Sequence, residues 1–118
     1  MSNDCIFCKI VAGQIPAKKI YEDDVVLAFH DIQPQAPVHA LVIPKRHMVC
    51  LDDLTPEERL QAGTLLERTA HVARELGVAQ TGYRTLINTR GHGGQEVDHL
   101  HIHILGGAAI GPMVCRHR

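Results

Sequence analysis

Three histidines alternate with aliphatic residues near the C-terminus, in the run HLHIHIL at residues 99–105. Successive side chains of a β-strand point to opposite faces, so this spacing predicts that the three imidazoles share one face while the aliphatic side chains enter a core. Along a strand, neighbouring imidazoles would lie about 6.6 Å apart and the outer pair about 13 Å apart. Nitrogen atoms that share one zinc ion lie within about 4 Å of each other, so a single ion cannot hold all three.

The pattern instead favours a central reactive imidazole with an assisting imidazole on each side. Phosphoryl or nucleotidyl transfer at neutral pH can use this arrangement, because a neutral His101 can attack a phosphate and form a nucleotidyl-imidazole that water later cleaves. The alternative is a set of half-exposed strand histidines without a task. Three histidines in strict alternation argue against it, because histidine is at best an ordinary strand former.

The composition favours a small-molecule ligand. The 118 residues are expected to form one domain, 1–118, that is large enough to bury a core. The formal net charge is −1, with two Phe, two Tyr and no Trp, so neither a basic surface nor stacking aromatics indicate nucleic-acid binding. The start, MSND, has no signal-peptide pattern, and no apolar run approaches the roughly 18 residues of a membrane span. We therefore expect a cytoplasmic protein with no nucleic-acid or membrane partner.

Four cysteines are present, at positions 5, 8, 50 and 115. In a reducing compartment they are not expected to form a disulfide framework. The pair Cys5-x-x-Cys8 indicates metal binding or redox chemistry, and Cys115 is expected to be a thiol in the C-terminal tail.

Short strands and one long helix make up the predicted fold. Hydrophobic patterning predicts a hairpin over Ile20–Asp31 with its turn at residues 22–24, and further strands at His39–Ile43, Thr85–Asn88 and 99–105. Short loops between most of these strands favour an antiparallel sheet in an α+β fold. Such a sheet has exposed edges, and pairing with a second copy of the chain is one way to cover them.

The clearest predicted element is a helix between Thr55 and Gly77. Thr55 is the expected N-cap, Pro56 occupies the first helical position, Glu58 completes a capping box, and Gly77 ends the helix. One face is expected to cover the sheet, through residues at helical spacing: Ala62, Leu65, Leu66, Thr69, Ala70, Ala73 and Leu76.

A glycine-rich segment, Gly91-His92-Gly93-Gly94, leads into the histidine run and is expected to form a tight loop. Glycines allow backbone N–H groups to approach an anion closely. Such a segment is more often only a turn, but its place before three imidazoles favours a phosphate ligand.

The histidine run matches the motif of the histidine triad superfamily. The chain further resembles the Hint branch, the purine nucleoside phosphoramidases, in four segments: 28–32 (AFHDI), 34–39 (PQAPVH), 41–45 (LVIPK) and 93–95 (GGQ). The resemblance extends from Cys5 to Pro112. It implies the histidine triad fold: an antiparallel five-stranded sheet with one long helix and a short N-terminal helix, in a homodimer whose sheet continues across the subunits.

The resemblance also implies roles for individual residues. His101 matches the nucleophile, His103 the histidine that contacts the phosphate and leaving group, and His39 a fourth histidine beside the triad. Asp31 matches the residue that holds the ribose hydroxyls. The other implied nucleotide-binding residues are Phe29 and Ile32 for the nucleoside, and Asn88, Gly94, Gln95 and Glu96 at the phosphate.

Two of these positions bear on the reaction. Glu96 stands where many eukaryotic members have a phosphate-contacting serine, and its carboxylate would repel phosphate unless only its backbone N–H is used. The transferase branch of the superfamily has glutamine where this chain has His103, so hydrolysis is favoured over transfer to a second phosphate.

Cys5 and Cys8 resemble a zinc-bearing subset of the superfamily, in which His47 and His99 would complete the site. The ligand types suit a tetrahedral Cys2His2 zinc. The spacing alone is weak support, because the gaps far exceed those of zinc fingers. The expected role is structural, holding the N-terminal segment against the active-site strand.

The sequence therefore predicts a dimeric hydrolase that splits nucleoside 5′-monophosphate, preferably purine, from an amine, carboxylate or phosphate leaving group. No cofactor is expected to be needed for the chemistry. One alternative is a non-catalytic nucleotide-binding or scaffold protein. Another is a hydrolase whose chemistry requires zinc.

Overall fold

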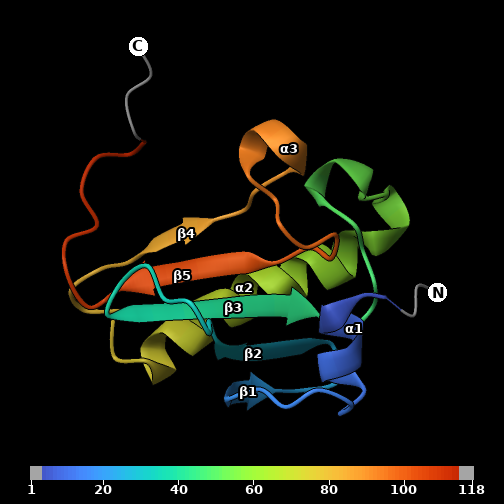
Figure 1. The fold of residues 1–118 in the computed structure, drawn as a ribbon, viewed down its shortest axis with the longest axis horizontal. Helices are drawn as coiled ribbons and strands as arrows, with labels where there is room; N and C mark the ends of the chain where they lie inside the picture. Colours follow the sequence, from blue (N-terminus) through green and yellow to red (C-terminus); the bar gives the residue numbers. More distant parts are fainter. Residues whose placement is uncertain (1–3, 115–118) are drawn as a thin grey trace.

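The structure is a computed structural model that describes residues 4–114 (Figure 1). The elements follow one another as α1 (Ile6–Val11), β1 (Lys19–Glu22), β2 (Val26–His30), β3 (Val38–Pro44), the 3-10 turns η1 (Leu51–Asp53) and η2 (Pro56–Glu58), α2 (Arg59–Glu75), β4 (Arg84–Leu86), α3 (Arg90–Gly93) and β5 (Ile102–Gly106).

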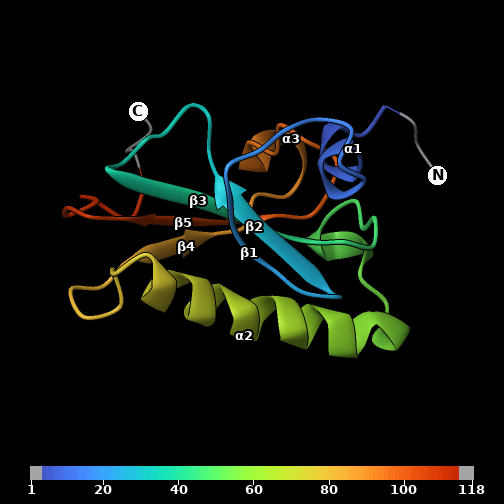
Figure 2. The ribbon, with the colours of Figure 1, turned by 90° about the horizontal axis from the view of Figure 1, so that it is seen from below.

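The five strands form one antiparallel sheet in the order β1-β2-β3-β5-β4. The long helix α2 lies against one face, while α1 and α3 lie on the opposite side (Figure 2). The predicted α+β class, five-stranded sheet, long helix and short N-terminal helix are all confirmed. Within residues 4–114, no helix is both long enough and apolar enough to cross a membrane.

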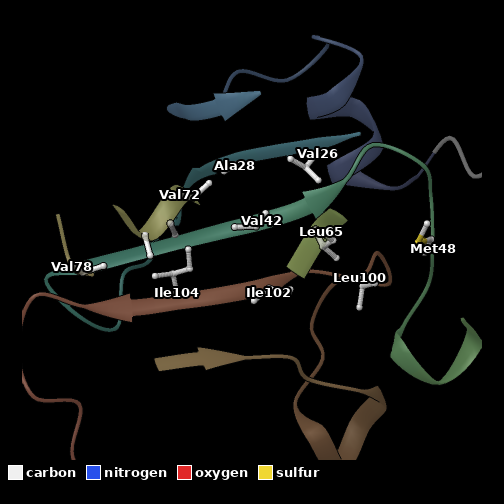
Figure 3. Packing of buried hydrophobic residues seen from close by; sticks show 12 residues of the cluster. Val26, Ala28, Val42, Met48, Leu65, Val72, Val78, Leu100, Ile102 and Ile104 are labelled. Atoms are coloured by element: carbon white, nitrogen blue, oxygen red, sulfur yellow. The ribbon is translucent and has the colours of Figure 1, made fainter. Parts of the chain in front are cut away.

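Alternation along the strands divides the buried residues into two clusters. Val26 and Ala28 of β2 face α2, whereas Leu27 and Phe29 face α1. The α2-side core contains Val26, Ala28, Ala40, Val42, Met48, Leu65, Val72, Ala73, Val78, Leu100, Ile102 and Ile104 (Figure 3). The α1-side core contains Cys5, Phe7, Ile10, Leu27, Phe29, Leu41 and Ile43.

The predicted signals at both ends of the long helix are present. The backbone N–H of Thr55 donates to the Glu58 carboxylate at 3.0 Å, and Pro56–Glu58 form a 3-10 turn that leads into α2. At the other end Gly77 has φ of +76°, and the N–H groups of Gly77 and Val78 donate back to α2 carbonyls, at 3.1 and 3.2 Å. This double hydrogen bond is a Schellman motif.

The predicted inner face of α2 is wrong at one position. Leu66 is 63% exposed, whereas Val72, which was not in the predicted set, is fully buried in the α2-side core. At 100° per residue, Val72 lies about 20° from Leu65 on the side away from Thr69 and Leu66, so the buried stripe is narrower than predicted and rotated away from Leu66.

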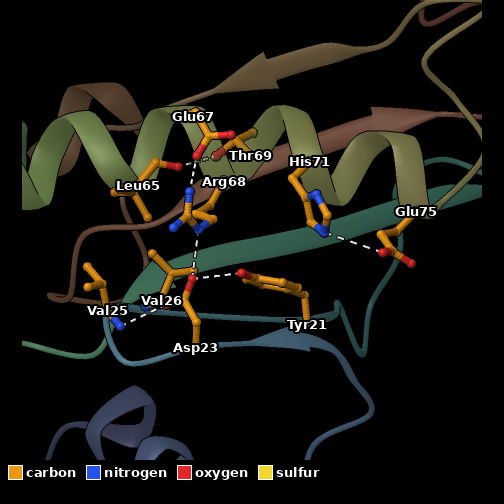
Figure 4. Close-up of polar contacts among 10 residues, drawn as sticks. All are labelled: Tyr21, Asp23, Val25, Val26, Leu65, Glu67, Arg68, Thr69, His71 and Glu75. Atoms are coloured by element: carbon orange, nitrogen blue, oxygen red, sulfur yellow. Dashed lines mark hydrogen bonds and ion pairs between the residues drawn. The ribbon is translucent and has the colours of Figure 1, made fainter.

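A polar network joins α2 to the turn between β1 and β2 (Figure 4). One oxygen of Asp23 accepts the backbone N–H groups of Val25 and Val26 at 2.7 and 2.8 Å. The other accepts the Tyr21 hydroxyl at 2.8 Å and Arg68 Nε at 2.7 Å. Burial opposes ionisation of the Asp23 carboxyl, but these hydrogen bonds outweigh it and hold its pKa well below the usual range. The β1–β2 hairpin is thereby fastened to α2.

Three predicted elements differ from the observed ones by more than one residue or in type. The strand predicted at Thr85–Asn88 is observed at Arg84–Leu86, and the tight glycine loop is a helical turn, α3, that ends at Gly94 with φ of +82°. The histidine strand begins only at Ile102. The ladder with β3 stops at the Val42–Ile102 pair although β3 continues to Pro44, and the Leu100 N–H donates instead to the Met48 carbonyl at 2.6 Å.

The faces predicted for the histidine run are nevertheless confirmed. Leu100, Ile102 and Ile104 lie in the α2-side core, while the rings of His99 and His101 contact Phe7 on the α1 side. Cys5, Cys8 and Cys50 are free thiols. Cys115 lies outside the described residues.

Candidate active site and metal centre

Three histidines of the site are brought together by neighbouring strands. His103 lies in β5 and His39 in β3, and the two strands pair antiparallel so that His103 faces Leu41 and His39 faces Leu105. His101 comes directly before β5, and its ring centroid lies 5.0 Å from that of His103. Neighbouring imidazoles are thus nearer than the strand repeat alone predicts.

A backbone carbonyl fixes the tautomer of His101. Its Nδ1 lies 2.7 Å from the carbonyl oxygen of His99, and a carbonyl can only accept. Nδ1 therefore carries a proton and donates it to that carbonyl. In the neutral ring Nε2 then keeps its lone pair, which is the arrangement that a nucleophile requires.

A chain of hydrogen bonds fixes the protons of His39 and His103. The backbone N–H of Gln35 donates to His39 Nδ1 at 2.9 Å, so the proton of a neutral His39 is on Nε2. That N–H lies 2.9 Å from His103 Nδ1 and 3.3 Å from an Asp31 oxygen. His103 Nδ1 therefore accepts and His103 Nε2 carries the proton. This Nε2 is buried and has no partner among the described residues.

The same residues are electrostatically prepared to remain neutral. Burial, followed by the neighbouring His101 and His39, lowers the pKa of His103 from 6.5 to about 4. Burial also lowers the pKa of His39, although the nearby Asp31 carboxylate opposes this. Both rings are therefore uncharged at neutral pH, as the hydrogen-bond chain requires.

The N-terminal helix contributes an aromatic side chain to the site. Phe7 of α1 is buried, and its ring packs edge-on against His101 with centroids 5.2 Å apart and planes at 90°. It also contacts the rings of His99 and Phe29, with centroids 5.8 and 5.6 Å away. The ring therefore restricts how far the His101 imidazole can tilt.

The segment between β4 and the histidine run is held by side chains from two directions. Gln95 Oε1 accepts the Arg90 N–H at 2.9 Å, and Gln95 Nε2 donates to the carbonyls of Val49 and Val97 at 2.7 and 3.0 Å. Arg90, with φ of +58°, forms ion pairs with Asp52 and Asp53. The Gln95 amide is thus engaged in shaping the loop.

The residues predicted to contact a nucleotide differ in accessibility. Ile32 is 92% exposed, whereas Phe29 is 4% exposed and belongs to the α1-side core. Asp31 accepts the backbone N–H of Gln33 at 2.8 Å through the oxygen that does not face His39. Of the residues expected at the phosphate, Asn88 is half-buried, while Gly94 and Glu96 are exposed.

A second cluster brings together the four predicted metal ligands, Cys5, Cys8, His47 and His99. Their ligand atoms all lie within 4.8 Å of one another. His99 Nδ1 is 3.3 Å from Cys5 Sγ, 3.6 Å from Cys8 Sγ and 3.2 Å from His47 Nδ1. Around a tetrahedral zinc with ordinary bond lengths, ligand atoms are separated by about 3.4–3.8 Å, so the cluster fits one zinc ion.

The chemistry of the donor atoms supports the same fit. His99 Nε2 lies 2.8 Å from the Pro44 carbonyl and therefore carries the proton, so Nδ1 faces the two thiols with a lone pair. Burial lowers the pKa of His99 to about 4, which keeps that lone pair free at neutral pH. Burial and the adjacent Cys5 raise the pKa of Cys8 to about 11, and a divalent cation would stabilise the thiolate.

Asp31, His39 and His103 are also close enough to share an ion. The hydrogen-bond chain through His39 already accounts for their proximity. His99 and His103 thus belong to different clusters, in agreement with the prediction that one metal cannot hold all three histidines of the run.

Several functional contacts were not foreseen from the sequence. Phe7, the Gln35 N–H and the Pro44 carbonyl each fix the orientation or tautomer of a site histidine. No pattern of residue types predicts such contacts, because two of the three are made by backbone atoms. For Phe7, the only signal is its position between Cys5 and Cys8.

Comparison with known proteins places this arrangement in a family. The HIT domain matches residues 12–110. The purine nucleoside phosphoramidase of Escherichia coli (strain K12) is 44% identical over 114 residues, which cover 97% of this chain and 96% of that protein.

Solved structures of similar chains have the same fold. A histidine triad protein from Clostridium difficile has a TM-score of 0.91 and 46% identity, covering 97% of this chain and 99% of that one. A HIT family hydrolase from Legionella pneumophila has a TM-score of 0.89 and 42% identity, with coverage of 92% and 96%. With its matching domain, fold and full-length relatives, this chain belongs to the HIT domain family and is a histidine triad hydrolase.

Proposed function

We propose that this hydrolase releases nucleoside 5′-monophosphates, preferably of purines, from phosphoramidate, acyl or phosphate leaving groups through a covalent nucleotidyl-His101 intermediate. One observation carries the proposal: His101 Nδ1 is held by the His99 carbonyl at 2.7 Å, which leaves Nε2 as a nucleophile beside the His103 N–H, which no group within residues 4–114 accepts. The similarity to the phosphoramidase of Escherichia coli supports the purine nucleotide as substrate.

The reaction proceeds in two displacements at phosphorus. In the first, the Nε2 lone pair of His101 forms a P–N bond as the bond to the leaving group breaks, and the leaving group departs with the electron pair and takes a proton from water. In the second, a water oxygen attacks phosphorus and the electron pair of the P–N bond returns to Nε2. The proton lost by that water passes to solvent.

His103 assists both displacements by hydrogen bonding. Its buried Nε2–H lacks a partner among the described residues, and a buried donor without a partner costs about 1–3 kcal/mol. A phosphate or leaving-group oxygen would satisfy it. Because negative charge builds up on these oxygens during each displacement, the hydrogen bond is stronger in the transition state than in the ground state. His39 keeps the proton on the required nitrogen by donating to His103 Nδ1.

The nucleoside would lie beside the end of β2. The exposed Ile32 offers an apolar surface to the base, and Phe29 supports the pocket from the α1-side core. One oxygen of Asp31 accepts the Gln33 N–H and the other lies near His39 Nε2. Each oxygen retains a lone pair that can accept a ribose hydroxyl. On the phosphate side, Asn88, Gly94, Gln95 and Glu96 complete the site, with Glu96 contributing its backbone N–H.

Cys5, Cys8, His47 and His99 hold a structural zinc ion in this proposal. Four protein ligands close a tetrahedral shell, whereas a catalytic zinc keeps one position open for water. The ion would fix α1 and the start of the histidine run to each other. The rival reading, a zinc-dependent hydrolase, requires an open coordination position that the four-residue cluster does not leave.

The proposal includes a homodimer in the cytoplasm. β4 is a three-residue strand at the edge of the sheet, and the apolar side chains of Leu86 and the following Ile87 are exposed. Pairing with a second copy along this edge would extend the sheet and cover that surface. Light scattering of the purified protein should give twice the mass of the chain, and a monomer mass at micromolar concentration would refute the dimer.

Turnover of two substrates tests the proposed reaction. Adenosine phosphoramidate and a dinucleoside polyphosphate share the adenylyl group but differ in leaving group, and we expect the phosphoramidate to be cleaved to AMP and amine. AMP binding without turnover of either compound would instead support the non-catalytic nucleotide-binding or scaffold protein. Absence of both binding and turnover would refute a nucleotide substrate altogether.

A further inference from the structure

The ring of Phe7 contacts a histidine of the candidate metal centre, His99, and the candidate nucleophile, His101. We propose that Phe7 is a positioning residue that links the Cys5/Cys8/His47/His99 centre to His101, so that a metal ion in that centre tightens nucleotide binding. This inference rests on the proposed nucleotide site and adds to it a form of regulation by metal occupancy. The metal takes no part in the chemistry.

Phe7 contacts a residue of each site. It directly precedes Cys8, and its ring lies edge-on to His101, 5.2 Å between centroids, and to His99 at 5.8 Å. The side chain is 6% exposed. A displacement of α1 therefore moves the Phe7 ring against the His101 imidazole.

The position of α1 depends on its surroundings. The helix has six residues, too few for stability on its own, because helices shorter than about 12 residues are marginal in water. Two features hold it: the burial of Phe7 and Ile10 in the α1-side core, and the contacts of Cys5 and Cys8 with His47 and His99. A metal ion bound to both cysteines would replace these contacts with metal–ligand bonds that join α1 to His47 and to His99.

Metal binding then reduces the ordering that a nucleotide must impose. Without the ion, binding of a nucleotide has to fix both α1 and the His101 ring, and the lost conformational freedom weakens the observed affinity. With the ion bound, α1 and the His101 ring are already ordered, so nucleotide binding loses less conformational freedom. Linkage is reciprocal, so bound nucleotide must increase the affinity for metal by the same factor.

The experiment measures this factor by calorimetry in both directions. AMP is titrated into zinc-loaded protein and into protein freed of zinc by a chelator, and zinc is titrated with and without saturating AMP. We expect about fivefold tighter AMP binding in the zinc-loaded protein, at the lower end of common coupling factors, and the same factor for zinc. Neither readout depends on catalytic turnover.

Matched variants identify the residue that carries the linkage. Phe7→Leu removes the ring but keeps an apolar side chain, and we expect it to bind AMP equally, within about twofold, with and without zinc. Phe7→Met provides the same test with a bulkier side chain if Phe7→Leu is too unstable. Val11→Ala is the control, because Val11 lies on the same helix but is only partly buried and is not one of the two features that hold α1, and its coupling factor should equal that of the parent.

Each outcome separates this inference from the proposed function. Equal AMP affinity of the zinc-loaded and zinc-free parent overturns the inference but not the nucleotide site. An undiminished factor in Phe7→Leu and Phe7→Met, or an equal loss in Val11→Ala, also overturns the role of Phe7. Failure of the parent to bind AMP in either form overturns the proposed function, and this inference with it.

Discussion

The two faces of the sheet are built from the same strands but differ in composition. On the α2 side, the core is aliphatic, and its buried hydroxyl, Thr69, donates to the Leu65 carbonyl at 2.8 Å. On the α1 side, the strands present His39 and His103, and the histidine run brings His99 and His101 to the same face, where two cysteines join them. Residue alternation thus assigns packing to one face and chemistry to the other.

This division has an energetic consequence. Burial of aliphatic side chains on the α2 side stabilises the fold without any dependence on protonation or ligands. On the α1 side, buried imidazoles are held neutral by burial, and their hydrogen bonds depend on tautomers that backbone groups fix. Substitutions on the α2 side should therefore affect stability first, and substitutions on the α1 side should affect activity first.

The largest expected effect is on turnover at the α1 side. His101→Ala should abolish hydrolysis of adenosine phosphoramidate, because no other nucleophile occupies its position. AMP affinity should change by less than about tenfold, equivalent to ~1.4 kcal/mol. Steady-state kinetics and calorimetry check the two expectations. Full activity in this variant would contradict the assignment of the nucleophile.

A matched substitution on the α2 side should reverse this pattern. Ile104→Ala removes a fully buried side chain from β5, three positions from His101, and should destabilise the protein by about 2–5 kcal/mol. Turnover per folded molecule at ambient temperature should stay close to that of the parent. Urea unfolding and initial rates measure the two quantities, and a rate loss as large as that of His101→Ala would mean that the faces are not separable.

The metal centre should contribute to stability more than to rate. Purified protein should contain about one zinc per chain, and a strong chelator or Cys5→Ser should lower the melting temperature more than the ambient rate, since metal binding adds to folding free energy. Metal analysis, thermal unfolding and initial rates test this. The idea fails if metal-free protein, purified under reducing conditions without chelator, melts no lower than after zinc is added.

The ribose contact should have a smaller and more selective effect. Hydrogen bonds to a charged group contribute about 1.5–3 kcal/mol, so Asp31→Ala should weaken ribonucleotide binding by one to two decades. Binding of 2′-deoxy analogues should weaken much less. Competition assays with both ligand classes check this, and equal losses for the two would assign Asp31 to the support of His39 alone.

The smallest expected effect is on the pH dependence of stability. The pKa of His103 is lowered by burial to about 4 from 6.5, so the unfolded chain binds more protons between these values. Stability should therefore fall as the pH is lowered from about 6.5 towards 4, and less steeply in His103→Gln. Urea unfolding at pH 7 and pH 5 measures the slopes, with contributions from other groups present in both proteins. Parallel slopes would show that His103 is not held neutral by the fold.

Local sequence signals predicted most of the fold. The capping box at Thr55 and the glycine at position 77 mark the ends of the long helix, and alternation assigned both faces of the histidine run. The exact extent of the strands depends on their partners. The ladder between β3 and β5 stops at the Val42–Ile102 pair although β3 continues to Pro44, and nothing in the histidine run itself marks that end.

The sequence predicts the residues of the candidate site but not which ring nitrogen of each histidine carries the proton. The histidine motif and the resemblance to the superfamily predicted His101, His103 and the four candidate metal ligands, and the structure brings those four ligands together. The tautomers depend on backbone groups at Gln35, Pro44 and His99, which no side-chain pattern reveals. Cys8 and His99 are 91 positions apart, and only the folded chain brings their ligand atoms to 3.6 Å.

The most direct test of the account is the mass of the protein during turnover. Adenosine phosphoramidate is mixed with the parent and with His101→Ala, the reaction is quenched, and intact masses are recorded. The quench is an acid-free denaturant, because acid hydrolyses the bond between phosphorus and imidazole. The account predicts an increase equal to one adenylyl group in the parent, located at His101 by peptide mapping, and no increase in the variant. An adduct on another residue would contradict the account. So would turnover by the parent without any adduct, when the reaction is sampled faster than one turnover.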